Sequence, residues 1–263
     1  MRVQQMNSSG DSISREWVQR NLQRVRERIG AATAKSGRAP ESVALIAVTK
    51  YFPGIDMIAM LKDLGVTHIG ESRVLDAERK FKELLAAHLQ NKKNLDPCSV
   101  NWHMIGHLQT NKSEKAVRVF HIIHSIDSVR AAEAINTEVN QLAASPQAAL
   151  LRQIMLQVNI ARDVNKYGLE PTIEDVTALL KICSEFERLN VVGLMGMAPF
   201  SENAEKTSRP VFKRLRELFE EANARKAYRQ PLTELSMGMT QDYWIGIEEG
   251  ATMVRIGSAL YEE

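Results

Sequence analysis

The chain has 263 residues, of which 44% are hydrophobic and 25% are charged, an ordinary balance for a globular protein. The formal charge is only +2, so the charge balance gives no reason to expect nucleic acid or an acidic membrane as a partner. The length allows either two small domains or one α/β barrel of about 250 residues.

The N-terminal residues 1–14 are polar and lack the apolar centre of a secretory signal, so we expect a flexible tail there. No apolar run reaches the roughly 18 residues that a membrane span needs. Cys98 and Cys183 are far apart and have no neighbours at metal-ligand spacing, which predicts neither a disulfide framework nor a zinc site. We therefore expect a cytoplasmic protein with one domain over residues 15–263.

The apolar residues of 14–37 recur at helical spacing and predict a first helix that ends at a glycine. Residues 43–48, VALIAV, predict a buried strand, and a Pro-Gly pair breaks the chain before a helix over residues 55–65. The same alternation continues to the end of the chain. The further predicted strands are residues 66–70, 101–106, 119–126, 151–160, 191–197, 232–239 and 252–257. The further predicted helices are residues 72–89, a helix that begins near Thr110, and residues 128–143, 172–189, 203–226 and 240–250.

Eight strands that alternate with helices favour parallel pairing through right-handed crossovers, and eight strands close a barrel. A doubly wound open sheet is the competing architecture. It normally carries a glycine-rich βα turn, and the sequence has no GxGxxG or Walker motif. We predict an α/β fold, a single (β/α)8 TIM-type barrel, with an extra N-terminal helix that covers an end or a flank of the barrel.

Lys50 stands at the end of the first predicted strand, where the functional groups of such barrels gather. A lysine at a strand end most often just extends into solvent. The alternative is a Schiff-base lysine, whose amine becomes nucleophilic through desolvation or cationic neighbours. Lys50 by itself does not decide between the two. Farther along the chain, the basic stretch 79–93 is interpreted as a solvated helix face.

Two turns of small residues follow two consecutive predicted strands: residues 236–238 follow the seventh strand, and residues 256–258 follow the eighth. Glycine allows close approach of a ligand to the backbone, and free N–H groups at such turns bind anions. Barrels often bind phosphate with the loops after strands seven and eight. The turns therefore predict a phosphate site about as strongly as they predict plain tight turns. Arg255 adds a cation on the last strand, for which a salt bridge is the default interpretation.

Seven short motifs occur in order between residues 47 and 261: AVTK, IGES, WHMIGHLQTNK, NKYG, GLMGM, LSMGMTQD and EEGATMVRIGSALY. Together they resemble the pyridoxal phosphate homeostasis protein family. The resemblance implies the barrel of the alanine racemase N-terminal domain, which is the fold type III of pyridoxal phosphate proteins. It also implies pyridoxal 5'-phosphate (PLP) as the cofactor.

Carried over residue by residue, the resemblance implies that Lys50 forms a Schiff base with the PLP aldehyde and that Arg255 faces the pyridine nitrogen. Ser72, His103 and Ile105 would flank the ring. Ser236, Met237, Gly257 and Ser258 would hold the 5'-phosphate. No catalytic residue and no metal ligand is predicted. The sequence departs from the family pattern at two positions. Ser72 stands where the family usually has asparagine, and the chain ends in YEE where the family usually has Phe-Gly.

The resemblance implies a protein that holds PLP reversibly and acts in intracellular vitamin B6 and amino-acid homeostasis, without turnover of its own. A guanidinium beside the pyridine nitrogen disfavours protonation there and so weakens carbanion chemistry. We also expect the chain to lack the second domain of alanine racemases. The alternative is a PLP-dependent amino-acid racemase or decarboxylase of fold type III, and a weaker one is a cofactor-free Schiff-base aldolase. We expect a monomer that serves PLP-dependent apo-enzymes and binds neither nucleic acid nor membrane.

Overall fold

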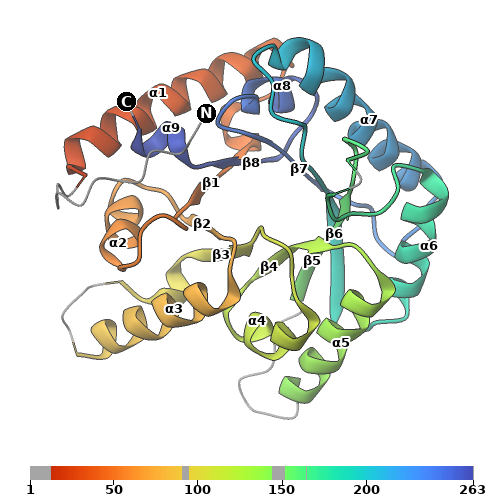
Figure 1. Ribbon diagram of the computed structural model, residues 1–263, viewed down its shortest axis with the longest axis horizontal. Helices are drawn as coiled ribbons and strands as arrows, with labels where there is room; N and C mark the ends of the chain where they lie inside the picture. The colour runs from red at the N-terminus through yellow and green to blue at the C-terminus, as the bar shows by residue number, and fades with distance from the viewer. Residues whose placement is uncertain (1–12, 91–94, 144–151, 164, 263) are drawn as a thin grey trace.

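The computed structural model describes residues 13–90, 95–143, 152–163 and 165–262. Eight parallel strands follow one another around a closed barrel, and pairing of the first strand with the last closes the ring (Figure 1). The predicted (β/α)8 barrel is thereby confirmed. The strands are β1 Ala44–Val48, β2 His68–Glu71, β3 Asn101–Met104, β4 Ile122–Ile126, β5 Arg152–Val158, β6 Leu189–Gly196, β7 Glu234–Met239 and β8 Met253–Ile256.

The helices surround the strands, and each predicted helix has a counterpart in the described part of the chain (Figure 1). They are α1 Arg15–Lys35, α2 Asp56–Asp63, α3 Val74–Leu89, α4 Ser113–Val119, α5 Val129–Ala143, α6 Ile173–Ser184, α7 Ala204–Ala224, α8 Tyr243–Glu248 and α9 Ser258–Tyr261. Short 3-10 turns cover residues 40–42, 97–99 and 110–112. The short helix α9 was not predicted, and α6 ends earlier than predicted because β6 already begins at Leu189.

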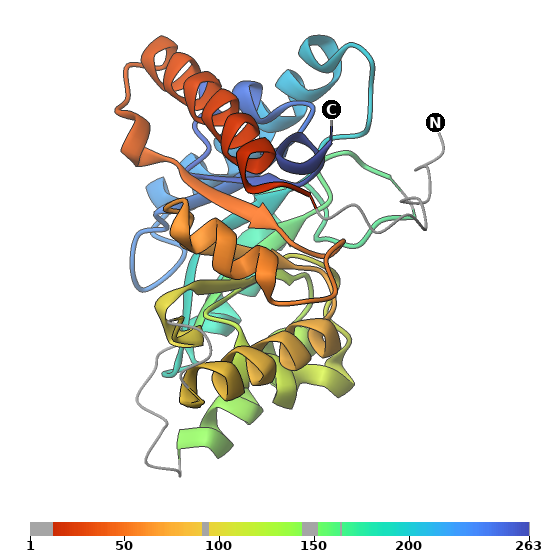
Figure 2. The same ribbon diagram turned by 90° about the vertical axis from the view of Figure 1, so that its left-hand side faces the viewer.

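The extra N-terminal helix covers the flank of the barrel where α8 and α9 lie (Figures 1 and 2). Its buried face includes Val18, Leu22 and Val25, which recur at the three- to four-residue spacing of an amphipathic helix. Ser14 caps the helix, because its hydroxyl accepts a hydrogen bond from the Trp17 N–H. Residues 1–12 of the predicted tail lie outside the described residues, so the domain boundary at residue 14 stays a prediction.

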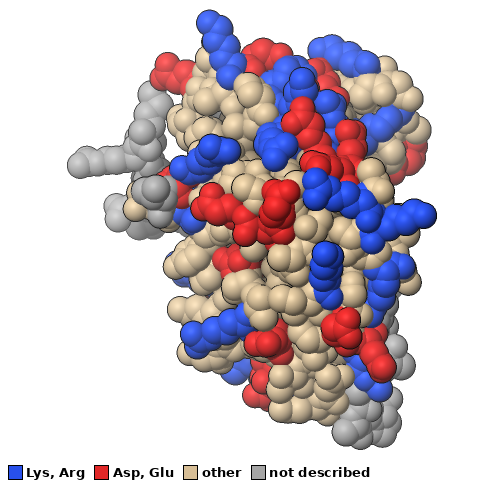
Figure 3. Space-filling model, turned by 90° about the vertical axis from the view of Figure 1, so that its right-hand side faces the viewer, with Lys and Arg blue, Asp and Glu red and all other residues tan. Residues whose placement is uncertain are grey.

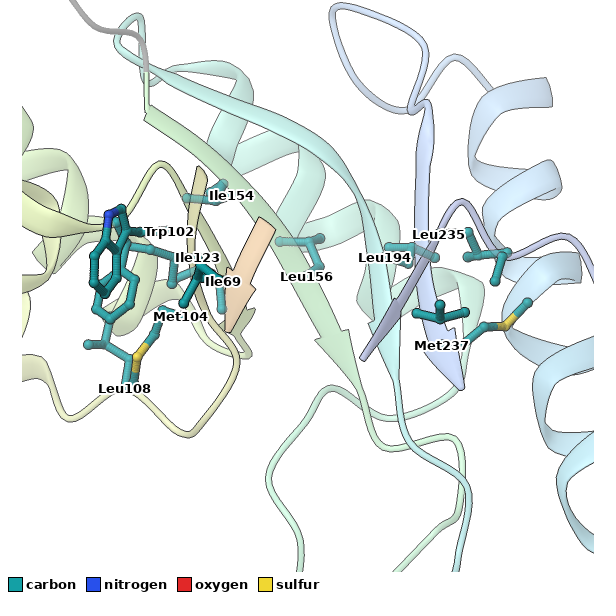
Figure 4. Packing of buried hydrophobic residues seen from close by; sticks show 14 of the residues in the cluster. Ile69, Trp102, Met104, Leu108, Ile123, Ile154, Leu156, Leu194, Leu235 and Met237 are labelled. Carbon is teal, nitrogen blue, oxygen red and sulfur yellow. The ribbon is translucent and has the colours of Figure 1, made fainter. Parts of the chain in front are cut away.

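Two apolar layers stabilise the barrel, and the strands separate them. The larger layer lies between strands and helices and includes Trp102, Ile123 and Leu194 (Figure 4). The smaller layer takes the alternate residues of the same strands, such as Met155 and Met195, which therefore point into the barrel. Full burial of one such side chain stabilises the fold by about 1.5–3 kcal/mol.

The surface carries charges of both signs. Figure 3 shows acidic and basic side chains interspersed on the face that it presents. On helix α7, Arg209 contacts Glu205 of the same helix and also Glu248 and Glu249 at the end of α8. Such a network adds more stability than an isolated surface pair does. In the described ranges, no helix is long and apolar enough to cross a membrane.

Candidate functional site

Lys50 lies two residues after the end of β1, at the carboxyl end of the barrel, and its side chain is exposed. Its Nζ lies 4.9 Å from the ring centroid of Tyr51. No ion pair joins Lys50 to a carboxylate among the residues that the structure describes. The amine is therefore available at the mouth of the barrel.

A buried ion pair holds the strand end that carries Lys50. Lys80 of α3 and Glu71 of β2 have exposed fractions of 1% and 0%, and their Nζ and Oε1 atoms lie 2.5 Å apart. Thr49 is tied to both, because its hydroxyl donates to Glu71 and its carbonyl oxygen accepts from Lys80 at 2.9 Å. The interpretation of residues 79–93 as a solvated face is wrong for Lys80. Its amine turns inward because Glu71 and Thr49 offer oxygens that satisfy it.

The two small-residue turns lie next to each other at the same end of the barrel. Gly238 has a φ of +95°, and a Cβ there would lie 2.7 Å from the Tyr243 Cα, so the turn into α8 requires glycine. The Ala259 N–H of α9 donates to the Thr240 hydroxyl at 3.3 Å and so links the two turns. A Cβ on Gly257 would lie 3.8 Å from the Tyr51 ring. The anion-binding turns predicted from the sequence and the residue after Lys50 are therefore neighbours.

Arg255 of β8 is 3% exposed and lies inside the barrel. Its Nη1 donates to the Ser236 hydroxyl oxygen at 2.5 Å and its Nη2 donates to the Gly196 carbonyl oxygen at 3.0 Å. The default salt bridge is not formed within the described ranges. Burial lowers the pKa of this guanidinium to about 10, an effect that the charge of Asp242 partly opposes. Arg255 thus remains a cation with N–H donors left for a ligand.

The predicted phosphate residues occupy different depths. Gly257 and Ser258 are half-buried at the rim, between β8 and α9. The Ser236 hydroxyl lies deeper, in contact with Arg255. The Met237 side chain packs in the outer apolar layer, which leaves only its backbone for a ligand (Figure 4). Thr240 was not predicted as a site residue, although it lies within the LSMGMTQD motif and places a hydroxyl at the rim.

The predicted ring-flanking residues separate into two groups. Ser72 and Ile105 follow β2 and β3 at the mouth, where both are half-buried. Their loops pack closely, because a Cβ on Gly106 would lie 2.2 Å from the Ser72 carbonyl oxygen. His103 instead is fully buried inside the barrel. Its ring nitrogens lie 2.9 Å from nitrogens of His68 and of His124, so in this structure its hydrogen bonds are made to protein groups.

A pocket of about 620 Å³ lies beside the mouth, between the segments that follow β2, β3 and β5. Two of its lining side chains, His107 and Tyr167, stack with ring centroids 3.6 Å apart and an interplanar angle of 11°. His107 also lies 3.8 Å from Asp127. Tyr167 therefore holds the segment after β5 against the segment after β3, and the two together form one side of the mouth.

Acid is expected to destabilise the protein through His103 and His124. Burial holds the pKa of both rings well below the ordinary histidine value of 6.5, and neighbouring histidines, together with Arg255 at His124, lower it further. Below pH 6.5 the unfolded chain takes up protons that the folded chain does not, so stability falls as the pH falls. Two such groups correspond to a loss of about 2.7 kcal/mol per pH unit below pH 6.

Urea unfolding curves between pH 8 and pH 5 measure this effect. Carboxylates with lowered pKa values, such as Glu78, lose their contribution only at lower pH, near their ordinary value of 4.5, and do not mask it. The His124→Gln variant is expected to show a smaller slope, because one of the two fully buried rings is gone, while burial also lowers the pKa of His68 and His121, which keep their contributions. A free energy of unfolding that stays constant from pH 7 to pH 5 would contradict the neutral state of the buried rings.

Comparison with known proteins places the chain among PLP-related families. The model of the family described as alanine racemase, N-terminal domain, matches residues 13–263. The pyridoxal phosphate homeostasis protein of Aquifex aeolicus is 35% identical over 242 residues, which are 92% of this chain and 96% of the relative. The protein of the same name from Escherichia coli K12 is 32% identical over 245 residues, which are 93% of this chain and 95% of the relative.

Solved structures agree with the sequence relatives. PipY of Synechococcus elongatus, solved with PLP bound, is 31% identical with a TM-score of 0.73, over 93% of this chain and all of that chain. An alanine racemase of Clostridium difficile, in complex with cycloserine, is 14% identical with a TM-score of 0.68. That match covers 94% of this chain but 60% of the racemase, and at this identity it shows the fold alone.

Proposed function

Because the chain belongs to the alanine racemase N-terminal domain family and to the pyridoxal phosphate homeostasis proteins, we propose that it binds PLP reversibly on Lys50 and keeps it in reserve for other proteins. When bound, PLP supplies an aldehyde that forms a reversible Schiff base with an amine. The observation that carries the proposal is the convergence of the Lys50 segment with the Gly257 turn, above the buried cation of Arg255.

The donor set of the site fits PLP. The cofactor has an aldehyde, a phosphate dianion and an aromatic ring nitrogen, and the site offers a matching group for each. Lys50 provides an exposed amine, and Arg255 provides N–H donors without a bound carboxylate among the described residues. Gly257 and Ser258 provide a rim onto which an anion can approach the backbone. We add Thr240 to this rim because its hydroxyl contacts α9.

The other predicted contacts complete the proposed site. Ser72 and Ile105 would flank the ring from the mouth loops, as the sequence motifs suggest. Ser236 and Met237 would contribute backbone groups toward the phosphate, while the Ser236 hydroxyl holds Arg255. His103 would support the site from inside the barrel, through His124, without touching the ring itself.

The chemistry of Arg255 favours a protein that stores PLP over an enzyme that uses PLP for catalysis. Its guanidinium can only donate hydrogen bonds, and its positive charge disfavours a second proton on the acceptor that it contacts. An unprotonated ring nitrogen withdraws electrons weakly, so the site would stabilise carbanions poorly. We propose a cytoplasmic monomer that passes PLP to apo-enzymes and has no turnover of its own. The alternative is an amino-acid racemase or decarboxylase of fold type III.

Hydrogen–deuterium exchange separates the two functions. The PLP-loaded protein, checked first for the near-ultraviolet absorbance of the bound cofactor, is incubated with L- and D-amino acids in heavy water. We expect exchange of the α-proton no faster than with free PLP. An exchange rate on the order of one per second would identify an enzyme and refute the reserve function. A protein that takes up PLP without any change in absorbance would refute covalent binding.

A further inference from the structure

A continuous chain of hydrogen bonds crosses the interior of the barrel. The ring nitrogens of His68 and His103 lie 2.9 Å apart, and those of His103 and His124 also lie 2.9 Å apart. The second nitrogen of His124 lies 3.1 Å from the Ser236 hydroxyl, which accepts from Arg255. The five residues come from β2, β3, β4, β7 and β8. The two central imidazoles are hydrogen-bonded through both of their nitrogens, and this arrangement lets a proton pass through a ring.

The chain runs from the buried interior to one end of the barrel. It begins at Arg255, which is 3% exposed and lies inside the barrel. Its lower end is His68, the first residue of β2, which is partly exposed. His68 lines a pocket of about 590 Å³ between α1 and the first residues of β1 and β2. A carboxylate, Glu234 at the start of β7, faces His68 closely enough to influence its charge.

The hydrogen bonds of Arg255 fix the direction of the chain. A guanidinium only donates, so the Ser236 oxygen accepts from Arg255 and its own proton needs an acceptor. Among the described residues, that acceptor is Nδ1 of His124. His124 then carries its proton on Nε2 and donates to Nδ1 of His103, which in turn donates from Nε2 to Nδ1 of His68. All three rings therefore adopt the same neutral tautomer, with the proton on Nε2.

We propose that His124, His103 and His68 form an oriented proton relay between Ser236, in the interior beside Arg255, and the pocket at the amino ends of β1 and β2. The cation of Arg255 and the carboxylate of Glu234 favour this direction, because each N–H dipole then points from the positive end to the negative end. His121 lies close to the relay but outside it. Its Nδ1 accepts from the Trp102 N–H at 3.1 Å.

The transfer conserves protons and charge. A proton supplied to the Ser236 oxygen by a water molecule or an acidic ligand group that enters beside Arg255 displaces the hydroxyl proton onto Nδ1 of His124. His124 passes its Nε2 proton to His103, His103 passes its own to His68, and His68 releases its Nε2 proton into the lower pocket. Each ring ends neutral, in the opposite tautomer, and the reverse transfer restores the starting state. The barrel itself does not need to open.

Nitrogen-15 NMR of histidine-labelled, ligand-free protein tests the relay, so the result is independent of PLP binding. Protonated and unprotonated ring nitrogens give well-separated resonances. We expect His68, His103 and His124 to be neutral at pH 7, with the proton on Nε2 in all three rings. A doubly protonated ring, or opposite tautomers in neighbouring rings, would overturn the proposal. This measurement on the unmodified protein needs no variant to fold.

The Ser236→Ala variant tests whether the three rings respond as one unit. It removes the group that donates to His124, so we expect altered tautomer populations not only in His124 but also in His68, two rings away. Ser125→Ala is the matched control, because Ser125 is buried beside His124 in sequence and its hydroxyl has no hydrogen-bond partner within the described residues. His68 resonances that stay unchanged in Ser236→Ala, or that move equally in Ser125→Ala, would refute the relay.

Discussion

Replacing Lys50 by alanine is expected to abolish the covalent PLP adduct. The amine of Lys50 lies at the mouth next to the turn that contains Gly257, and alanine leaves no nucleophile at this position. After incubation with PLP and reduction with borohydride, the wild-type protein should gain the mass of one cofactor on the peptide that contains Lys50. The alanine variant should show no adduct at the same PLP concentration.

Two further variants separate the loss of the covalent PLP adduct from the loss of positive charge and from labelling of other lysines. Lys50→Arg keeps the positive charge but cannot form the adduct, so it should bind PLP only without a covalent bond. Lys62→Ala is the matched control on α2, where the lysine amine donates to the Ser99 carbonyl oxygen outside the mouth. It should label like the wild type. An adduct of undiminished yield in Lys50→Ala would show that another amine holds the cofactor.

Replacing Lys80 by methionine is expected to destabilise the protein by about 3–5 kcal/mol, the cost of leaving a buried carboxylate without its partner. Lys80 and Glu71 are almost completely buried, and Oε2 of Glu71 already lacks a hydrogen-bond partner within the described part of the chain. Methionine fills most of the lysine volume, so the loss reports the charge rather than a cavity. Because Thr49 also loses a hydrogen bond, the strand end before Lys50 should loosen.

Urea unfolding measures this loss of stability. Two further variants test whether it comes from the buried ion pair. Lys82→Met lies on the same helix, but its amine is exposed and pairs with Glu78, so it should cost at most about 0.5 kcal/mol. The double variant Lys80→Met with Glu71→Gln removes both charges and should recover a large part of the stability. A loss below about 1 kcal/mol for Lys80→Met would show that the ion pair with Glu71 contributes little to stability and would contradict this prediction.

The barrel could be predicted because the alternation of apolar strand segments with amphipathic helices repeats along the whole chain. Every strand of the described chain falls within or close to an apolar run that the sequence shows, and the strong helical pattern of α1 and α7 leaves little ambiguity. Helix α9 was missed because its four residues are too few for a period of 3.6 to be visible. The early end of α6 was missed because residues 185–188, which separate the helix from β6, include helix-forming glutamates and an arginine and contain no glycine or proline to mark the end.

The sequence predicts where the site lies along the chain, but not which of its side chains point into the barrel interior. The rule that function gathers at the carboxyl ends of the strands identifies Lys50 and the Gly257 turn. It does not say which side chains point inward, and the Ser236 hydroxyl and His103 turn out to lie inside the barrel. The burial of Lys80 could not be read from its neighbours in sequence either. Its basic neighbours in the sequence suggest that its side chain is exposed to solvent. Its partner Glu71, however, belongs to β2 and becomes a neighbour only in the folded protein.

Closure of the barrel between β1 and β8 has a consequence for synthesis of the protein. Ala47 pairs with Ile256, so the two halves of the proposed site lie far apart in the sequence and meet only after β8 has been translated. A nascent chain on the ribosome therefore has no complete site until β8 emerges. A ligand that bridges this seam stabilises only the finished protein, by mass action. The vitamin supply of the cell would in this way influence how long newly made copies survive proteolysis.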